Sequence, residues 1–464
     1  MRRTRIIATI GPASVDTTTL TALIEAGVDV TRLNASHSDK KALADMLAQV
    51  RYCAERVGRP VAAMLDLPGP KLRVGDVCSG ALLEKGAAFD IVAEDEQGDS
   101  KSASVPYDDL WRDVAAGDTV LLDDGCIVLE VQRSSPGLVE TVVKAGGRLR
   151  PHKGVNVPSV RLSLPSVTAE DLELAVWAAE AGVDIVAQSF VRSAADVHLL
   201  REAMGPDGPW IVAKVEKHEA VDDLDAIIDA ADAIMVARGD LGVEVPVEQV
   251  PILPRRIVAT CRASGRPVIV ATQMLESMIH AVSPTRAEAS DVAQAIFQGA
   301  DAVMLSAETA VGEDPVGVVE TMARIALAAE AEGPPAPRRD RPRPGDVSEA
   351  VSAAVVRLAE RLGAAAIITS TRSGSTACAV AAHRPSEPIV AVTSEPETAR
   401  RLSLVWGVTA LVIPGERTVE GTFDKACEAA VGAGLAHPGD IVALTAGVSV
   451  GRSGGTDLIR VITV

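Results

Sequence analysis

The sequence predicts an α/β protein in which buried parallel strands alternate with helices, with a small β domain inserted and a separate open α/β domain at the end. Two observations carry this prediction. Apolar runs of strand length recur between residues 5 and 310, and helical sequence fills most of the gaps between them. The pattern is interrupted after Pro68-Gly69-Pro70 and again at a proline-rich segment near residue 335. At 464 residues, the chain is long enough for about three domains.

Residues 1–66 alternate between apolar runs and amphipathic segments. Apolar runs of this length are typical of strands buried on both faces, which occur in parallel sheets covered by helices. The expected elements are a strand at 5–10, a helix at 17–26, a strand at 28–33, a helix at 39–57 and a strand at 61–66.

The sequence from about 75 to 150 reads as an inserted β domain. It consists of short alternating stretches such as DTVLLDDGCIVLEV, in which Asp124-Gly125 predicts a hairpin turn. The segment KGVNVP at 153–158 marks the return of the chain to the larger unit.

Helix–strand pairs resume after this insertion and continue to about residue 330. Thr168 and Asp171 form a candidate capping box for a helix at 168–181. Residues 332–345 are too rich in proline for a regular element and are read as a linker. The open α/β domain beyond it is expected to have helices at 347–362, 375–383, 396–405 and 423–434, and strands at 364–370, 388–393, 409–413, 440–445 and 458–464.

The composition argues against several classes of partner. The formal net charge of −18 disfavours a polyanion, and 2% aromatic residues leave few surfaces on which nucleic-acid bases could stack. The six scattered cysteines have no metal-ligand spacing and are read as reduced thiols. No apolar run reaches the ~18 residues that cross a bilayer, and the N-terminal MRRTRIIATIGPAS reads as a first strand rather than a signal peptide. We therefore expect a soluble cytoplasmic protein that binds neither nucleic acid nor membranes.

Five of the apolar runs end in side chains that can do chemistry. They are AGVDVTRLN (26–34), WIVAKVEK (210–217), ADAIMVARGD (231–240), RPVIVATQM (266–274) and GADAVMLSAET (299–309). The C-terminal ends of parallel strands meet at one face, and active sites are built there. The side chains expected to converge include Arg32, Lys214, Glu216, Arg238, Asp240 and Thr272.

Two acids among these residues are candidate metal ligands. Lys214 and Glu216 are two apart on a strand and project to the same face, although an ordinary ion pair would show the same spacing. Asp240 follows Gly239, which allows backbone N–H groups to approach an anion closely. Two carboxylates suit Mg²⁺ or Mn²⁺, which takes its other ligands from water and substrate oxygens.

The cationic residues near these acids suit a phosphorylated substrate. Arg32 and Arg73 can pair bidentately with a phosphate, and Lys214 can act as a point charge. Phosphoryl transfer needs little beyond such positioning and charge neutralisation.

Seven segments between residues 3 and 312 resemble, in the same order, segments of the pyruvate kinase family. They are RTRIIATIGPAS (3–14), DVTRLNASH (29–37), KGVNVP (153–158), IVAKVEKHEAV (211–221), IMVARGDLGVE (234–244), VIVATQMLESM (268–278) and PTRAEASDVAQAIFQGADAVMLSAETAVG (284–312). The resemblance implies a (β/α)₈ TIM barrel at 1–69 and 157–335, an inserted small β-barrel lid domain at 70–156, and a C-terminal α/β effector-binding domain at 336–464.

The reaction implied is transfer of the phosphoryl group of phosphoenolpyruvate to ADP, giving ATP and pyruvate at the end of glycolysis. The resemblance implies that Glu216 and Asp240 bind Mg²⁺ (or Mn²⁺) and that Lys214 and Arg32 stabilise the phosphoryl group. It also implies that Thr272, with the backbone at 238–240, holds the pyruvate carboxylate, and it makes Thr272 a candidate for the proton relay that converts the enolate to the ketone. Capping of the strand end by the Thr272 hydroxyl is the alternative to its carboxylate-binding role. The group that delivers that proton stays open. Other substrate-binding residues implied are Gly239, Asp240 and Arg73, and nucleotide-binding residues are Asn34, His37 and Lys153.

One departure from the family pattern concerns potassium. Many members bind K⁺ beside the residues that match Asn34, Ser36, Asp66 and Leu67, and they carry DTKGPEIR where this chain has DLPGPKLR at 66–73. Lys71 replaces the glutamate, so its ammonium could supply the charge that K⁺ otherwise provides. The chain therefore resembles the potassium-independent branch, and we expect K⁺ not to be required. A solvated hinge lysine is the alternative.

The C-terminal domain carries a candidate effector loop. Residues Thr371, Arg372, Ser373, Gly374, Ser375 and Thr376 lie between an expected strand and helix, where backbone amides and hydroxyls can hold a phosphate. The loop resembles the sugar-phosphate loop of the family, but Ser/Gly-rich turns are also common at such positions. Fructose bisphosphate, a hexose monophosphate and AMP stay open as effectors, and SVGRSGGTD (449–457) is either a closing loop or a flexible connection. The family also implies a homotetramer.

Two other functions are compatible with parts of the pattern. Another metal-dependent lyase or mutase acting on pyruvate-like acids would share Glu216, Asp240 and the carboxylate site, but would not need a lid, Lys214 and a nucleotide site together. A non-catalytic metabolite sensor with the same fold would be expected to lack Lys214, Glu216 or Asp240, and all three are present.

Overall fold

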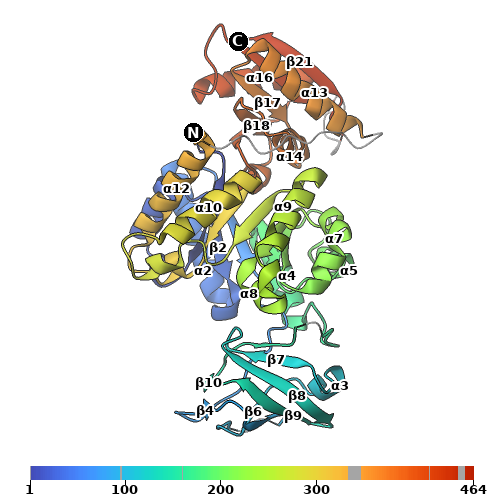
Figure 1. The fold of residues 1–464 in the computed structure, drawn as a ribbon. Coiled ribbons are helices and arrows are strands. Elements are labelled where there is room, and N and C mark those ends of the chain that lie inside the picture. The colour runs from blue at the N-terminus through green and yellow to red at the C-terminus, as the bar shows by residue number, and fades with distance from the viewer. Residues whose placement is uncertain (1, 95–96, 159, 333–345, 417, 448–454) are drawn as a thin grey trace.

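The computed structural model describes residues 2–94, 97–158, 160–332, 346–416, 418–447 and 455–464 and shows three parts in a row (Figure 1). A barrel lies in the middle, the inserted β domain lies at one end, and the C-terminal domain lies at the other. Residues 333–345 of the expected linker and 448–454 of the last loop are outside the described residues.

The central part is a closed barrel of eight parallel strands, which confirms the fold class. Around the barrel the order is β1-β16-β15-β14-β13-β12-β3-β2, so the inserted domain leaves the barrel after β3 and the chain returns to β12. The strands are β1 (Arg5–Ile10), β2 (Val30–Asn34), β3 (Ala62–Asp66), β12 (Ile185–Gln188), β13 (Trp210–Val215), β14 (Ala233–Ala237), β15 (Val268–Ala271) and β16 (Ala302–Leu305).

Helices surround the barrel. The predicted capping box is present: Asp171 N donates to Thr168 Oγ1 over 3.0 Å, and the Asp171 carboxylate accepts from Thr168 N over 2.9 Å. The helices and 3₁₀ turns of this part are α1 (Thr17–Ala26), η1 (Ala35–His37), α2 (Lys40–Val57), α4 (Ala169–Ala181), α5 (Ala194–Met204), α6 (His218–Asp222), α7 (Leu224–Ala230), α8 (Arg238–Glu244), η2 (Val247–Gln249), α9 (Ile252–Ser264), η3 (Glu276–Ile279), α10 (Arg286–Gln298), α11 (Ala307–Ala310) and α12 (Pro315–Glu332).

Both faces of the barrel strands are buried, as the continuous apolar runs predicted. One hydrophobic cluster fills the space between strands and helices, and a second fills the barrel interior with side chains such as Ile7, Met64 and Val212. Leu404 of the C-terminal domain belongs to the interior cluster and is fully buried. The interior is therefore a packed core, closed by the C-terminal domain, and chemistry is left to the opposite end.

An aspartate precedes each of four barrel strands and fixes the start of the neighbouring strand. In each case Oδ2 accepts a hydrogen bond of 2.8–3.0 Å from a backbone N–H of that neighbour. The pairs are Asp29 with Ile6, Asp184 with Ala63, Asp232 with Ile211, and Asp301 with Val268. Because these carboxylates are used in the backbone ladder, they belong to the structural end of the barrel.

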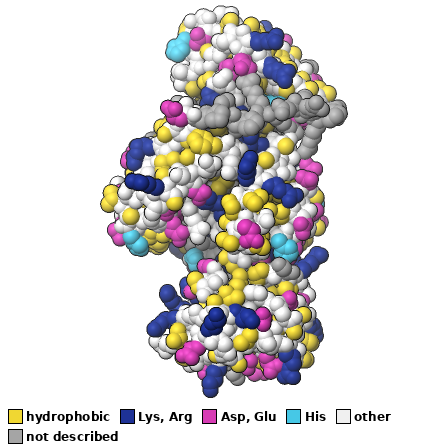
Figure 2. Space-filling view, in the orientation of Figure 1, with side chains coloured by type: hydrophobic (Ala, Val, Ile, Leu, Met, Phe, Trp, Pro, Cys, Tyr) yellow, Lys and Arg dark blue, Asp and Glu magenta, His cyan; other side chains and the backbone are white. Residues whose placement is uncertain are grey.

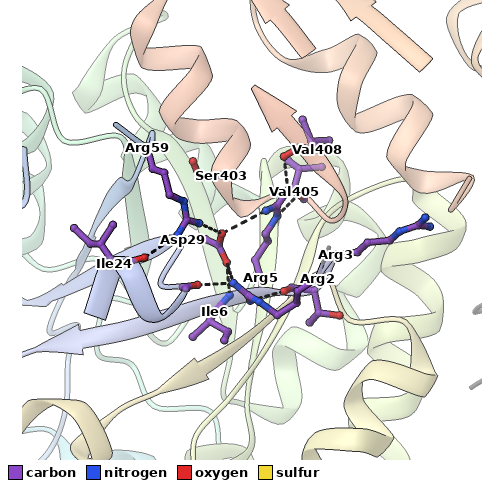
Figure 3. A network of polar contacts seen from close by, with 12 residues as sticks. Arg2, Arg3, Arg5, Ile6, Ile24, Asp29, Arg59, Ser403, Val405 and Val408 are labelled. Carbon is purple, nitrogen blue, oxygen red and sulfur yellow. Dashed lines mark hydrogen bonds and ion pairs between the residues drawn. The ribbon is translucent and has the colours of Figure 1, made fainter. Parts of the chain in front are cut away.

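Arginines join this end of the barrel to the C-terminal domain. Arg5 reaches from Asp29 to the Val405 and Val408 carbonyls, as Figure 3 shows. Arg400 pairs with Asp184 over 2.7 Å, and Arg384 pairs with Asp301 over 2.9 Å. The two parts thus share buried charge pairs.

The inserted domain confirms the expected β texture, and the expected small β-barrel takes the form of two sheets. A six-stranded sheet has the order β11-β7-β8-β9-β5-β6, and a two-stranded sheet pairs β10 with β4. Asp123 and Asp124 adopt positive φ between β7 and β8, so the predicted hairpin is present. The elements are β4 (Leu82–Leu83), β5 (Ala88–Val92), β6 (Ser102–Ser104), α3 (Leu110–Asp113), β7 (Thr119–Leu122), β8 (Ile127–Ser135), β9 (Leu138–Ala145), β10 (Gly147–Arg148) and β11 (Val155–Asn156).

The C-terminal domain is an open five-stranded sheet of order β19-β18-β17-β20-β21, with β21 antiparallel. Two helix predictions needed correction. Helix 423–434 begins at Val419 because Thr418 Oγ1 accepts from Gly421 N, and helix 396–405 divides into α15 and η4. The elements are α13 (Val347–Leu362), β17 (Ala366–Ser370), α14 (Ser375–Ala382), β18 (Ile389–Thr393), α15 (Pro396–Arg401), η4 (Leu402–Leu404), β19 (Val408–Val412), α16 (Val419–Gly432), β20 (Ile441–Ala446) and β21 (Leu458–Thr463).

The surface agrees with the composition. Figure 2 shows acidic and basic side chains interspersed on the visible face, and hydrophobic side chains near the junction of the inserted domain with the barrel. Among the described helices, none combines the length and apolar character required to span a bilayer.

Candidate active site

Lys214 lies at the centre of a polar cluster at the C-terminal ends of the barrel strands. Its Nζ is 2.9 Å from Glu216 Oε1, 3.1 Å from Asp66 Oδ1 and 2.8 Å from Ser189 Oγ. Burial lowers the pKa of Lys214, but Asp66 and Glu216 outweigh burial and raise the pKa above its ordinary value. The ammonium is therefore charged at neutral pH.

Asp66 joins Lys214 to Arg32. Arg32 Nε pairs with Asp66 Oδ2 over 2.6 Å, and Arg32 also donates to Thr9 Oγ1 over 3.1 Å. Burial pushes the pKa of Asp66 upward, yet Lys214 and Arg32 outweigh it and hold the pKa below its ordinary value. Asp66 thus keeps two cationic side chains oriented in the same small volume.

Glu216 is buried and its carboxylate is held by two donors. In addition to Lys214, Phe190 N donates to Oε2 over 2.8 Å. Burial raises the pKa of Glu216, Lys214 opposes this, and the negative charge of Asp240 raises it further. The two acids are therefore close enough for their charges to interact.

Asp240 lies in the first turn of α8 and pairs with Lys71, whose Nζ is 3.2 Å from Oδ1. A divalent cation favours hard carboxylate oxygens, and the repulsion between Glu216 and Asp240 would be relieved by a cation shared by both. The residues present therefore fit Mg²⁺ or Mn²⁺. In the described part of the chain, no group of three or more His, Cys, Asp or Glu side chains is arranged to hold a metal ion.

Thr272 has a strained backbone, with φ +67°, in the left-handed region that β-branched residues rarely adopt. Its Oγ1 accepts from Gly239 N over 2.8 Å and donates to the Ala271 carbonyl over 2.6 Å. Arg238 donates to the Thr272 carbonyl over 2.8 Å and pairs with Asp291. The terminal nitrogens of Arg238 therefore make contacts within the protein, and these contacts hold the Thr272 segment in place.

The predicted nucleotide and potassium residues lie near the same end of the barrel but are not all joined to the cluster. Asn34 Oδ1 accepts from Ser36 N over 3.2 Å and caps η1, which ends at His37. On the inserted domain, Lys153 pairs with Asp123 over 2.8 Å. Arg73 also lies there, where it donates to the His152 carbonyl over 3.0 Å.

Lys71 does not contact the predicted potassium residues within the described part of the chain. Within the described residues, no hydrogen bond or ion pair joins it to Asn34, Ser36 or Asp66, and its partner is Asp240. The Leu67 carbonyl, which was expected in that region, accepts from Ser189 Oγ over 2.6 Å. Lys71 thus supplies positive charge beside the candidate metal ligand.

Ser189 and Phe190 are site residues that the sequence reasoning missed. Ser189 Oγ contacts Lys214 and the Leu67 carbonyl, and Phe190 has φ +52° and holds Glu216 through its N–H. The Phe190 ring also packs on Gly69, where a Cβ would lie 2.7 Å from Phe190 Cδ2. The available signal was the polar end of the apolar run GVDIVAQSFV, which has the same form as the five runs singled out.

The candidate effector loop borders a cavity of about 260 Å³ in the C-terminal domain. The loop ends in the first turn of α14, and the Gly374 N–H is used internally, since it donates to Thr371 Oγ1 over 2.9 Å. The lining includes Thr371, Arg372, Ser373, Ser375 and Thr376, so only Gly374 of the predicted six is absent from it. The cavity is separate from the Lys214 cluster.

Comparison with known proteins identifies the family. The family model "Pyruvate kinase, barrel domain" matches residues 1–319, and "Pyruvate kinase, alpha/beta domain" matches residues 349–462. Similar proteins include the pyruvate kinases of Geobacillus stearothermophilus (44% identical, covering 99% of this chain and 80% of that protein) and Clostridium acetobutylicum (40% identical, covering 99% of each). The pyruvate kinase of Mycobacterium intracellulare is 41% identical and covers 99% of this chain and 98% of its own length. With its acids, lysine and barrel in the places described above, this chain belongs to the pyruvate kinase family.

Proposed function

We propose that this chain transfers the phosphoryl group of phosphoenolpyruvate to ADP, giving ATP and pyruvate. The observation that carries the proposal is the position of Lys214, whose ammonium contacts Glu216 and Asp66 at the catalytic end of the barrel. The matches to both family domains favour this reaction over a lyase or mutase on the same barrel.

Lys214 and Arg32 stabilise the transferring phosphoryl group. Both carry a positive charge, and both are oriented by an ion pair with Asp66. Such fixed charges are the main source of catalysis in phosphoryl transfer. Arg73, on the segment that leaves the barrel after β3, is assigned as an additional substrate contact.

Glu216 and Asp240 hold the divalent cation. When bound there, Mg²⁺ or Mn²⁺ would supply positive charge that offsets the negative charge of the substrate. Thr272, with Gly239 beside it, borders the place where the substrate carboxylate and enolate lie, and its hydroxyl is the candidate for a proton relay. The hydrogen bond from the Gly239 N–H fixes the rotamer of the Thr272 hydroxyl.

Potassium is not required in this proposal because Lys71 provides an ammonium group that is tethered to the chain. Its placement 3.2 Å from Asp240 supports a role in charge balance at the metal ligands. Initial rates should be equal in K⁺ and in tetramethylammonium at the same ionic strength. Many-fold stimulation by K⁺ would contradict the proposal, and Lys71→Gln is expected to make the enzyme respond to K⁺.

Nucleotide binding is assigned to Asn34, His37 and Lys153, and binding of a phosphorylated allosteric effector is assigned to the loop 371–376. The loop borders a cavity large enough for a small phosphate ester. We further propose a cytoplasmic homotetramer, with the barrel at 1–69 and 157–335, the lid at 70–156 and the effector domain at 336–464. Titration with fructose bisphosphate, hexose monophosphates and AMP tests the effector site, and light scattering tests the tetramer.

The reaction is tested by ATP formation from phosphoenolpyruvate and ADP with Mg²⁺ present. We expect ATP to appear in proportion to pyruvate and to depend on added divalent cation. Consumption of phosphoenolpyruvate without ATP formation would contradict the proposal. Glu216→Gln serves as the matched variant, since it keeps the side-chain shape but removes one of the two charges.

A further inference from the structure

One buried carboxylate outside the catalytic cluster joins the lid to both metal-binding segments. Glu244 is the last residue of α8 and is 3% exposed. Its Oε1 accepts from Asn156 Nδ2 over 2.8 Å and lies 2.7 Å from Lys217 Nζ. Asn156 belongs to the lid strand β11, and Lys217 follows the metal ligand Glu216. A single oxygen therefore connects three segments of the chain.

On the lid side of this contact, the strand of Asn156 is hydrogen-bonded into the lid sheet. Asn156 pairs with Leu121 of β7, and Asp123 N donates to the Gly154 carbonyl over 3.0 Å. The return strand therefore moves with the lid sheet, and the orientation of the Asn156 side chain reports the orientation of the lid.

The barrel side of the contact leads directly to the metal ligands. Asp240 lies four residues before Glu244 on the same helix, so a shift of Glu244 along or around α8 moves Asp240 with it. Lys217 is bonded in sequence to Glu216, so its ion pair with Glu244 also fixes the distance between the two segments. Both connections are short and buried.

Stability alone does not account for a charged group at this position. Glu244 Oε2 is buried and accepts no hydrogen bond from any described residue, which makes the carboxylate costly to bury. Buried ion pairs are frequently matched or exceeded in stability by apolar residues of similar volume. What the carboxylate does provide is a directional contact to an amide and an ammonium at once.

We propose that Glu244 is a positioning residue, which sets the orientation of the lid relative to Glu216 and Asp240 through its contacts with Asn156 and Lys217. The inference rests on the proposed function, since it assumes that the lid closes over nucleotide held near these two acids. In this proposal Glu244 has no direct contact with substrate or metal, since its contacts are with Asn156 and Lys217.

The test compares the steady-state kinetics of the wild-type chain with those of variants that alter only the lid contact. Asn156→Ala is expected to lower kcat/KM for ADP by about 10- to 100-fold, because a displacement of about 1 Å at a reacting group can cost that much. Binding of Mn²⁺, measured by electron paramagnetic resonance in the absence of nucleotide, should change less than threefold. A merely structural role would lower the melting temperature without separating these two readouts.

The decisive test is whether exchanging the amide of Asn156 and the carboxylate of Glu244 restores activity. Asn156→Asp places two carboxylates against each other and should be at least as damaging as Asn156→Ala, whereas Asn156→Asp combined with Glu244→Gln restores a carboxylate–amide pair in reverse and keeps one negative charge near Lys217. The double variant should regain at least tenfold in kcat/KM for ADP. Lys144→Met, which removes an exposed ion pair with Glu130 within the lid, is the control and should behave as wild type.

Two outcomes overturn the inference. One is wild-type kcat/KM for ADP in both Asn156 variants, and the other is a double variant no better than Asn156→Asp alone. In either case an active wild-type enzyme leaves the proposed function standing. A wild-type chain that forms no ATP removes the proposed function, and the inference falls with it.

Discussion

Replacing Lys214 with methionine tests the assignment on which the proposed function depends most. The side chain keeps its length and apolar stem but loses the charge that lies 2.9 Å from Glu216 and 3.1 Å from Asp66. If the ammonium lies about 3 Å from one negative charge of the phosphoryl group, and the effective dielectric constant is about 20, the two charges attract each other by roughly 5 kcal/mol. Since 1.36 kcal/mol corresponds to a tenfold change in rate, the loss of this attraction can lower kcat by at most about 10⁴-fold.

Part of that energy is also present in the ground state, so a loss of kcat of about 10³-fold is expected for Lys214→Met. The fold should survive because Asp66 keeps its 2.6 Å contact with Arg32 and Glu216 keeps the Phe190 N–H. The pKa of Glu216, already raised by burial, should rise further without the ammonium. Metal binding near neutral pH is expected to persist.

The assay is ATP formation from phosphoenolpyruvate and ADP at saturating Mg²⁺, with Mn²⁺ binding measured in parallel. Lys41→Met is the matched control, since Lys41 is 85% exposed and pairs with Asp45 on the surface of α2. Turnover of Lys214→Met within tenfold of wild type, with metal bound normally, would refute the role assigned to this ammonium. Loss of both activity and metal binding would mean that Lys214 supports the metal site instead.

Three further predictions concern the hydroxyl, the domain interface and acid stability. Thr272→Ala should lower kcat by about 10²-fold because the Gly239 N–H loses its acceptor and the candidate relay is removed, whereas Thr272→Ser should stay within tenfold; equal losses in the two variants would contradict the assignment. Asp184→Asn removes the charge that pairs with Arg400 and Arg51, and breaking a buried charge pair costs about 3–5 kcal/mol. It should therefore lower the melting temperature by about 10 °C while kcat at 25 °C stays near wild type, and an unchanged melting temperature would show that both pairs are dispensable. The folded-state pKa of Asp66 lies below its unfolded value of 3.8, so its stabilisation is present above about pH 4 and is lost as the pH falls through the folded pKa. The melting-temperature difference between wild type and Asp66→Asn should therefore be largest above pH 5 and shrink below pH 4, and a difference independent of pH would argue against this linkage.

Most of the fold could be predicted because its signals are local. A buried strand can be recognised in the sequence as an apolar run. The start of a helix can be recognised by side chains that cap its backbone, as Thr168 and Asp171 do. The missed start of α16 has the same kind of cap at Thr418, but a glycine in its first turn weakened the helical pattern. The hairpin at Asp124-Gly125 was likewise fixed by residues that are neighbours in sequence.

By itself, the sequence determined the order of the elements and which acids, lysines and hydroxyls stand at the strand ends, because periodicity and strand polarity depend on neighbouring residues. The partner of each of those side chains was decided only by the tertiary structure. Lys71 against Asp240, Ser189 under Lys214, and Asn156 against Glu244 are pairs separated by 25 to 169 positions. Such contacts depend on how the barrel closes and how the lid is seated on it, and no local pattern encodes that geometry.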